Sequence, residues 1–144
     1  MSALPLTPAM LPHIAAIERA VFAQPWSEQS LRLLCGDTAF GVAVVENGVP
    51  VAYGGMLTVL DEGQITNIAT LPDYRRRGFA AEVLTALLAG ARSRKLAFVT
   101  LEVRESNAPA IALYEKFGFA VVGRRKNFYT EPVEAALVMQ CNLD

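Results

Sequence analysis

The sequence predicts a mixed α/β domain, and three observations support this prediction. The chain has 144 residues, which fits one domain of roughly 100 to 200 residues. With 53% hydrophobic and 19% charged residues, it can bury a core, which excludes intrinsic disorder. Segments whose apolar residues repeat every two positions are interleaved with segments of period about 3.6, so strands and helices occur along one chain.

The first third of the chain contains a short predicted strand and two helices. The strand is expected at residues 3–6. Thr7 and Pro8 have the types that favour an N-cap and a first helical residue, so a helix is expected to about Ala23. Apolar residues at helical spacing follow at Met10, Ile14, Ile17 and Val21. Ser27 can cap a second, shorter helix that carries Leu31, Leu33 and Leu34.

Three strands are predicted next. The Val-rich, alternating segment 40–46, the dipeptide Asn47-Gly48 and the segment 50–60 have the pattern of a β-hairpin. Residues 61–63 form a second turn, which leads into a strand over residues 64–71.

The period then changes to that of a helix. Ala80, Leu84, Leu87, Leu88 and Ala91 form one apolar stripe, which predicts a helix over about residues 77–94. The remaining elements are a strand at 98–103, a helix at 108–117 that ends at Gly118, and strands at 119–125 and 135–142.

Charge is unevenly distributed along the sequence. The formal net charge is −1, which argues against a protein that coats nucleic acid. Residues 1–74 hold two basic and seven acidic residues, whereas residues 75–144 hold eleven basic and seven acidic residues. Nine of the basic residues form clusters at 75–77, at 92, 94 and 95, and at 124–126. We therefore expect the second half to bind an anion and the first half a cation.

Neither a membrane segment nor a metal site is expected. Residues 1–17 carry no formal charge, but three prolines and His13 interrupt them, and a span needs about 18 unbroken apolar residues. Cys35 and Cys141 lie 106 positions apart and the chain has one His, which is not a zinc pattern. A folded, cytoplasmic chain without a metal is the resulting prediction.

The segment 71–80 joins a predicted strand to a predicted helix and is rich in arginine. N–H groups in the first turn of a helix have no intrahelical partners and bind phosphate well. Gly78 and Ala80 are small, so a pyrophosphate could lie directly on these amides. The segment matches neither GxxxxGK[ST] nor GxGxxG. A solvated basic turn is the alternative interpretation.

Arg75-Arg-Arg-Gly78-Phe-Ala80 matches the acetyl-CoA motif R/Q-x-x-G-x-G/A, and the chain resembles the GNAT family of N-acetyltransferases. The resemblance extends over the segments 25–28, 67–69, 101–107, 110–119 and 124–129. It is greatest to the bacterial branch that acetylates the N-terminal alanine of a small-subunit ribosomal protein. These segments together cover most of the chain.

The resemblance implies one N-acetyltransferase domain over residues 1–144, with acetyl-CoA as co-substrate. It implies a mostly antiparallel sheet of six to seven strands with a central, splayed parallel pair, flanked by about four helices. Where segment 67–70 diverges from its neighbour 101–103, free backbone N–H groups would bind pantetheine and the thioester carbonyl. By resemblance, the cofactor-binding residues are Ile68, Ala69, Thr70, Arg75, Arg76, Arg77, Gly78, Phe79, Ala80, Ala81 and Asn107.

Two residues are candidates for acid–base catalysis. Alternation places Glu102 on the strand face shared by Phe98 and Thr100, where partial burial would make it a better base, directly or through water. Tyr114 follows Asn107 by two helical turns, and its family counterpart is thought to protonate the leaving thiolate. The alternatives are a solvated Glu102, a core Tyr114 and an Asn107 that only caps its helix.

The resemblance places the acceptor near Trp26 and the loop around Tyr129 and Glu131. The acidic first half would suit a basic protein N-terminus, as a small-subunit ribosomal protein could present. A lysine side chain or a small amine is the alternative acceptor, and Trp26 could simply fill the core. A noncatalytic acyl-CoA-binding domain and an RNA-contacting module are the other classes, although no direct nucleic-acid binding is expected.

Overall fold

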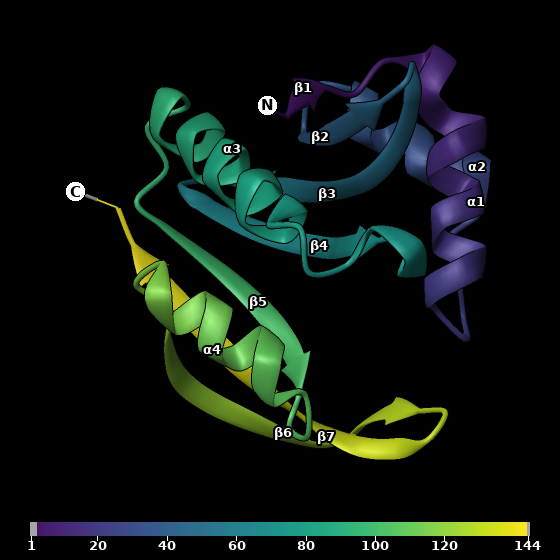
Figure 1. Cartoon of the computed structure of the whole chain (residues 1–144). Helices are drawn as coiled ribbons and strands as arrows, with labels where there is room; N and C mark the ends of the chain where they lie inside the picture. Colours follow the sequence, from purple (N-terminus) through teal and green to yellow (C-terminus); the bar gives the residue numbers. More distant parts are fainter. Residues whose placement is uncertain (1–2, 144) are drawn as a thin grey trace.

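A computed structural model describes residues 3–143, which form a seven-stranded sheet with helices on both faces (Figure 1). The sheet order is β1-β2-β3-β4-β5-β7-β6. The strands are β1 (Leu4–Pro5), β2 (Ala39–Glu46), β3 (Val49–Val59), β4 (Glu62–Thr70), β5 (Phe98–Arg104), β6 (Ala120–Thr130) and β7 (Val133–Asn142). The α-helices are α1 (Leu11–Val21), α2 (Glu28–Leu31), α3 (Phe79–Ser93) and α4 (Ala108–Lys116), with short 3₁₀ turns at Pro8–Met10, Arg32–Cys35 and Pro72–Tyr74.

This architecture confirms the predicted mixed sheet, including the short first strand and the hairpin. Asn47 and Gly48 have φ angles of 52° and 79°, the left-handed conformations that a tight type I′ hairpin requires. Strand β6 is five residues longer at its end than the predicted 119–125, because its ladder with β7 resumes at Tyr129 after a register shift that follows Arg125.

The two predicted N-caps have different outcomes. Ser27 caps α2, since its hydroxyl accepts the Ser30 N–H at 3.1 Å. Thr7 and Pro8 occupy the predicted N-cap and first helical positions, but of a 3₁₀ turn, and the Thr7 side chain makes no capping hydrogen bond. The Thr7 carbonyl instead accepts the Met10 N–H at 3.0 Å in this turn, and α1 begins only at Leu11.

Two apolar cores lie on opposite faces of the sheet. Helix α3 packs with Val42 and Val44 of β2, whereas α1 packs with the intervening Ala43 and with Tyr53. Side chains alternate across a strand, so these residues point in opposite directions. Figure 1 shows α3 and α4 over one face and α1 and α2 at the far end of the sheet.

The central parallel pair is joined over a short length. Strands β4 and β5 pair only at Glu62–Phe98, Gly63–Val99 and Gln64–Thr100. Beyond these pairs, β4 continues along β3 and β5 continues along β7. The predicted splay between residues 67–70 and 101–103 is therefore confirmed.

A β-bulge lies beside this opening. The register shift between Gly54 and Met56 leaves Thr66 and Asn67 of β4 opposite the single residue Gly55. A Cβ on Gly55 would lie 2.7 Å from both Leu34 Cδ1 and Thr66 Oγ1, so only glycine fits. Bulges bend a strand and redirect its side chains, and this one directs Asn67 toward α1.

Within residues 3–143, no helix combines the length and the apolar character needed to cross a membrane.

Candidate active site

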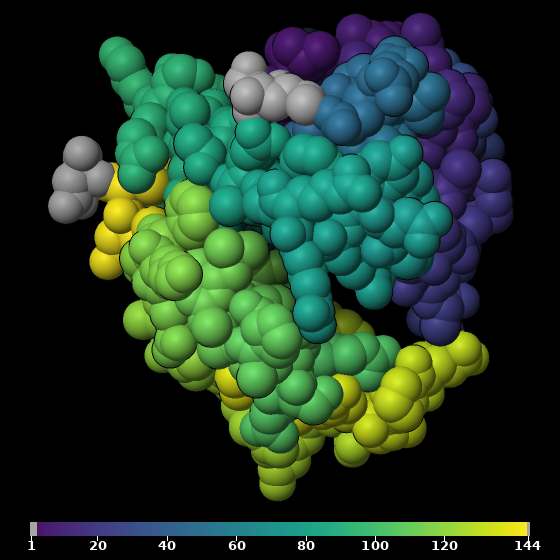
Figure 2. All heavy atoms as spheres, in the orientation of Figure 1, coloured from purple at the N-terminus to yellow at the C-terminus, as the bar shows by residue number. Residues whose placement is uncertain are grey.

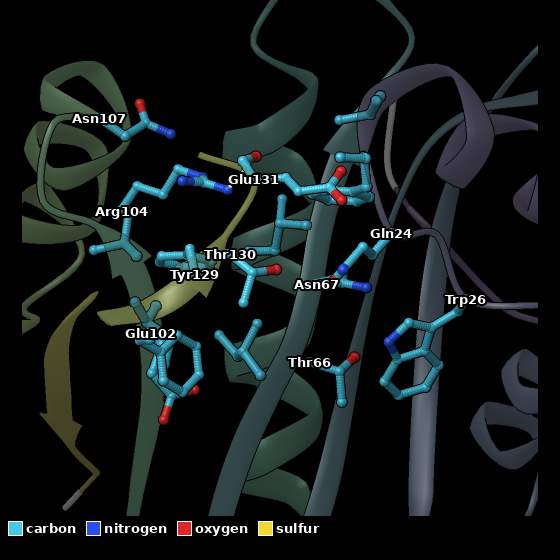
Figure 3. Close-up of a pocket in the computed structure, with 18 of the residues that line it drawn as sticks. Gln24, Trp26, Thr66, Asn67, Glu102, Arg104, Asn107, Tyr129, Thr130 and Glu131 are labelled. Carbon is cyan, nitrogen blue, oxygen red and sulfur yellow. Dashed lines mark hydrogen bonds between the residues drawn. The ribbon is translucent and has the colours of Figure 1, made fainter. Parts of the chain in front are cut away.

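A cleft of about 630 Å³ opens where β4 and β5 diverge. Figure 2 shows a hollow between the purple-to-teal N-terminal half and the green-to-yellow C-terminal half. Its walls come from the segment after α1, from β4 and β5, from α4 and from the turn between β6 and β7 (Figure 3). The cleft therefore lies where residues from distant parts of the sequence meet.

A second cavity of about 230 Å³ lies at the N-terminus of α3. Gly78 precedes the helix with a φ of 81°, and a Cβ placed on it would meet no atom within 4 Å. The space beside the first-turn N–H groups of α3 is thus open, as an anion site requires. Of the residues predicted to bind the cofactor, those that line this cavity are Thr70, Arg75, Arg76, Gly78, Phe79, Ala80 and Ala81.

The remaining predicted cofactor residues are placed differently. Ile68 and Asn107 line the larger cleft, which shares Arg75 with the smaller cavity. Ala69 is buried in the α1 core and lines neither cavity. The guanidinium of Arg77 lies 5.1 Å from the Tyr74 ring centre and lines neither cavity either.

Glu102 lines the cleft, near the end of β5. Its side chain is 34% exposed, and its Oε2 lies 4.0 Å from Arg125 Nη2. The side chain is therefore partly buried, as predicted, and its exposed part borders the open space at the end of β5. A carboxylate in this position can exchange protons with a molecule in the cleft.

Tyr114 lines the same cleft from α4. Burial raises the pKa of its phenol to about 12, with a smaller contribution from Tyr129, so the hydroxyl is protonated at neutral pH. Asn107 caps the helix, because its Oδ1 accepts the Ala110 N–H at 3.3 Å. Since its side chain also borders the cleft, capping leaves the amide NH₂ available to a ligand.

The three residues predicted to contact the acceptor, Trp26, Tyr129 and Glu131, all line the cleft. Figure 3 shows Trp26 on the opposite side from Glu102 and Arg104. Arg104 Nη2 donates to the Glu131 carbonyl at 3.0 Å, which ties the turn between β6 and β7 to β5. Burial raises the pKa of Tyr129, partly offset by the nearby Arg104 cation.

One buried carboxylate in this region was missed by the sequence analysis. Glu18 of α1 has no exposed surface. It accepts hydrogen bonds from the backbone N–H of Trp26 at 2.8 Å, from Asn67 Nδ2 at 2.9 Å and from the Tyr53 hydroxyl. Burial, and secondarily the Glu18 charge, raise the pKa of Tyr53 above its usual range. Glu18 lies four residues after Ile14 on the apolar stripe, which is the pattern that could have revealed it.

A sheet opened between two parallel strands, next to a cavity at a helix N-terminus, defines the class of the protein: the fold is that of an N-acetyltransferase. The model of the acetyltransferase (GNAT) family matches residues 11–119, and the chain belongs to this family.

The individual relatives are bacterial enzymes that modify a ribosomal protein. The chain is 39% identical over 131 residues to the ribosomal protein bS18-alanine N-acetyltransferase of Escherichia coli K12, covering 90% of this chain and 88% of the relative. The Haemophilus influenzae enzyme of the same name is 38% identical, with 88% of each chain covered. The crystal structure of the Escherichia coli ribosomal-protein alanine N-acetyltransferase superimposes with a TM-score of 0.91 at 36% identity, covering 99% of this chain and 94% of that one.

Proposed function

We propose that this protein transfers the acetyl group of acetyl-CoA to the N-terminal α-amine of a small-subunit ribosomal protein that begins with alanine. The observation that carries the proposal is the 39% identity, over 90% of the chain, to enzymes named for this reaction. The cleft supports it, because a carboxylate and a protonated phenol border one opening in the sheet. The 144 residues would act as one domain, in the cytoplasm, where ribosomal proteins are made.

The chain can hold acetyl-CoA without any rearrangement of the α3 N-terminus. The open space at Gly78 and the N–H groups of Phe79, Ala80 and Ala81 fit a pyrophosphate, and Arg75 and Arg76 add positive charge. Backbone groups of β4 that have no partner on β5 can bind the pantetheine arm and polarise the thioester carbonyl. Acetyl-CoA supplies the activated acetyl group.

Glu102 and Tyr114 would move the protons of the reaction. An α-amine has a pKa of about 7.7 to 8.0, so part of it is neutral at physiological pH and a modest base suffices. Glu102 accepts the proton that the attacking amine loses, directly or through water. Tyr114 donates its phenolic proton to the departing thiolate, and its raised pKa keeps that proton in place beforehand.

The acceptor would enter through the open side of the cleft, between Trp26 and the turn that carries Tyr129 and Glu131. The exposed carboxylates of Glu102 and Glu131 border this entrance, and opposite charges speed the encounter with a basic peptide. The same charges favour the ammonium form of an approaching amine, which loses one proton to water before it attacks, so that Glu102 stays free for the proton released on attack.

Acetyl transfer to a matched pair of peptides tests the proposal. The first peptide begins with alanine and has a free α-amine, and the second has a blocked α-amine and an internal lysine. We expect mass spectrometry to find one added acetyl group, on the α-amine of the first peptide alone. Acetylation of only the blocked peptide would show a lysine acetyltransferase, and acetylation of a polyamine instead of both peptides would show a small-molecule enzyme.

A further inference from the structure

A buried carboxylate lies behind the acceptor side of the cleft. Glu18 is fully buried, yet it touches two residues that line the cleft, Trp26 and Asn67. We propose that Glu18 is a positioning residue that fixes the Asn67 amide with its oxygen toward the acceptor amine. This inference rests on the proposed function, because it assigns how that function recognises its amine.

The orientation of Asn67 follows from the hydrogen-bonding capacity of its neighbours. An ionised carboxylate can only accept hydrogen bonds, so the amide nitrogen, not the oxygen, must face Glu18. Nδ2 donates to Glu18 Oε2 at 2.9 Å. The nitrogen end of the amide is therefore fixed against Glu18, and Oδ1 points away from the carboxylate.

The free oxygen of Asn67 faces the cleft. No donor in the described part of the chain, residues 3–143, reaches Oδ1, and Asn67 lines the cleft from the β4 bulge. Figure 3 shows Asn67 on the β4 wall and Glu102 on the opposite β5 wall. A primary amine between Asn67 and Glu102 can donate one N–H to the Asn67 oxygen and another to the Glu102 carboxylate.

Glu18 fixes a second part of the same wall. Its Oε1 accepts the Trp26 N–H at 2.8 Å, and the segment around Trp26 also supplies Phe22 and Gln24 to the cleft. One carboxylate thus sets both the segment after α1 and the amide on β4. If the amide were reversed, its NH₂ group would face the acceptor amine. The partial positive charge of that NH₂ group would repel the ammonium form of the amine.

The kinetics of Glu18→Gln test this role, with Glu28→Gln as the matched control. Glu28 is exposed on α2 and does not line the cleft. A glutamine at position 18 can donate to Oδ1 and so permits the amide to reverse. We expect KM for the alanine-starting peptide to rise about tenfold, while kcat and the Kd of acetyl-CoA stay within about threefold, the pattern of lost ground-state binding. Glu28→Gln should leave all three unchanged.

An unchanged KM in folded Glu18→Gln would overturn the inference. So would equal losses in KM and in acetyl-CoA binding, because these indicate general disruption. If Glu18→Gln does not fold, Asn67→Ala decides the question, since it removes Oδ1 and leaves Glu18 in place. We expect Asn67→Ala to raise the peptide KM by a similar factor, and an unchanged KM would overturn the proposal.

Nuclear magnetic resonance of the unmodified protein separates this inference from the proposed function. The Asn67 side-chain N–H protons should exchange with water more slowly than those of Asn47, which lies in the exposed hairpin turn. The Asn67 side-chain carbonyl should shift when the alanine-starting peptide is added and not with acetyl-CoA alone. A rapidly exchanging Asn67 amide overturns the inference even if acetylation occurs. A protected amide without acetylation of any peptide refutes the proposed function instead.

Discussion

The guanidinium carbon of Arg104 lies 4.2 Å from the centre of the Tyr129 ring. The same group donates to the backbone carbonyls of Glu131 and Pro132, each at 3.0 Å, and to Glu134 Oε1 at 3.2 Å. One side chain of β5 therefore holds the turn between β6 and β7, which forms one side of the cleft.

Replacing Arg104 should make the turn between β6 and β7 more mobile without affecting the cofactor site. We expect Arg104→Met to raise the peptide KM several-fold, because the carbonyls of Glu131 and Pro132 lose their donor. Faster amide hydrogen exchange in residues 128–133 would accompany it. Arg124→Met is the control, since Arg124 pairs with Glu105 at 2.6 Å on the surface. Similar effects of both variants would contradict the role of Arg104.

Alanine substitution of Gly78 tests the anion site, and the same substitution of Gly48, in the hairpin turn, is its matched control. Both have positive φ angles, 81° and 79°, and open space where a Cβ would stand. Alanine at either position should cost about 1 kcal/mol of stability through backbone strain. Only Gly78→Ala should weaken acetyl-CoA binding in calorimetry, by about tenfold, because only its Cβ enters the cavity at α3. Equal binding by both variants would contradict a pyrophosphate site there.

Glu102→Gln should remove the base while the cofactor site stays intact. General-base catalysis contributes about 10² to 10⁴ in rate, so we expect kcat to fall by at least about 100-fold. The Kd of acetyl-CoA should not change, because Glu102 lines the cleft and not the cavity at α3. Glu115→Gln, on the exposed side of α4, is the control. A Glu102→Gln enzyme with normal turnover would require another base.

Tyr114→Phe tests the acid. Only the hydroxyl is removed, so the ring contact with Phe119, centred 5.9 Å away, is kept. We expect kcat to fall by about 10² or more, the usual effect of a lost general acid, with little change in the melting temperature at neutral pH. A thioester with a better leaving group needs less help from an acid, so it should restore part of the kcat that Tyr114→Phe loses. If kcat is not restored, proton donation by Tyr114 is contradicted.

Alkaline pH should destabilise the protein through Tyr114. Its pKa is about 12 in the folded protein and 10.0 as the ordinary value, so the unfolded chain releases this proton first. The resulting stabilisation is fully present below pH 10 and is lost as pH rises toward 12. Denaturant titrations across this range should show a decline that is shallower in Tyr114→Phe. Identical slopes for the two proteins would contradict the raised pKa.

Much of this fold could be predicted from local patterns. The Asn47-Gly48 hairpin and the stripe of α3 each follow from residues close together in sequence. The longer end of β6 could not be predicted, because Arg124, Arg125 and Lys126 break the apolar alternation. The β4 bulge was equally hidden, since it depends on which residue of β3 lies opposite Asn67.

In the candidate site too, the features set by neighbouring residues could be predicted, and those set by contacts between distant residues could not. The cavity at α3 was largely predictable because most of its lining residues lie between Tyr74 and Ala81, although Arg77 is not among them. The open space that Glu102 borders was not, because it depends on how far β5 separates from β4. The role of Glu18 depends on contacts with residues 8, 35 and 49 positions away, and a helical wheel alone shows only that a charge faces the core.

The sheet has a weak seam, since three residue pairs join its two parts. The core beneath α3 also joins the two parts, and a molecule that bridges the seam adds to this cohesion. Ligand occupancy and folding are then thermodynamically linked, and saturation at 100 times Kd adds about 2.7 kcal/mol to the free energy of unfolding. In a cell, the abundance of the folded protein would accordingly follow the supply of its own acyl donor.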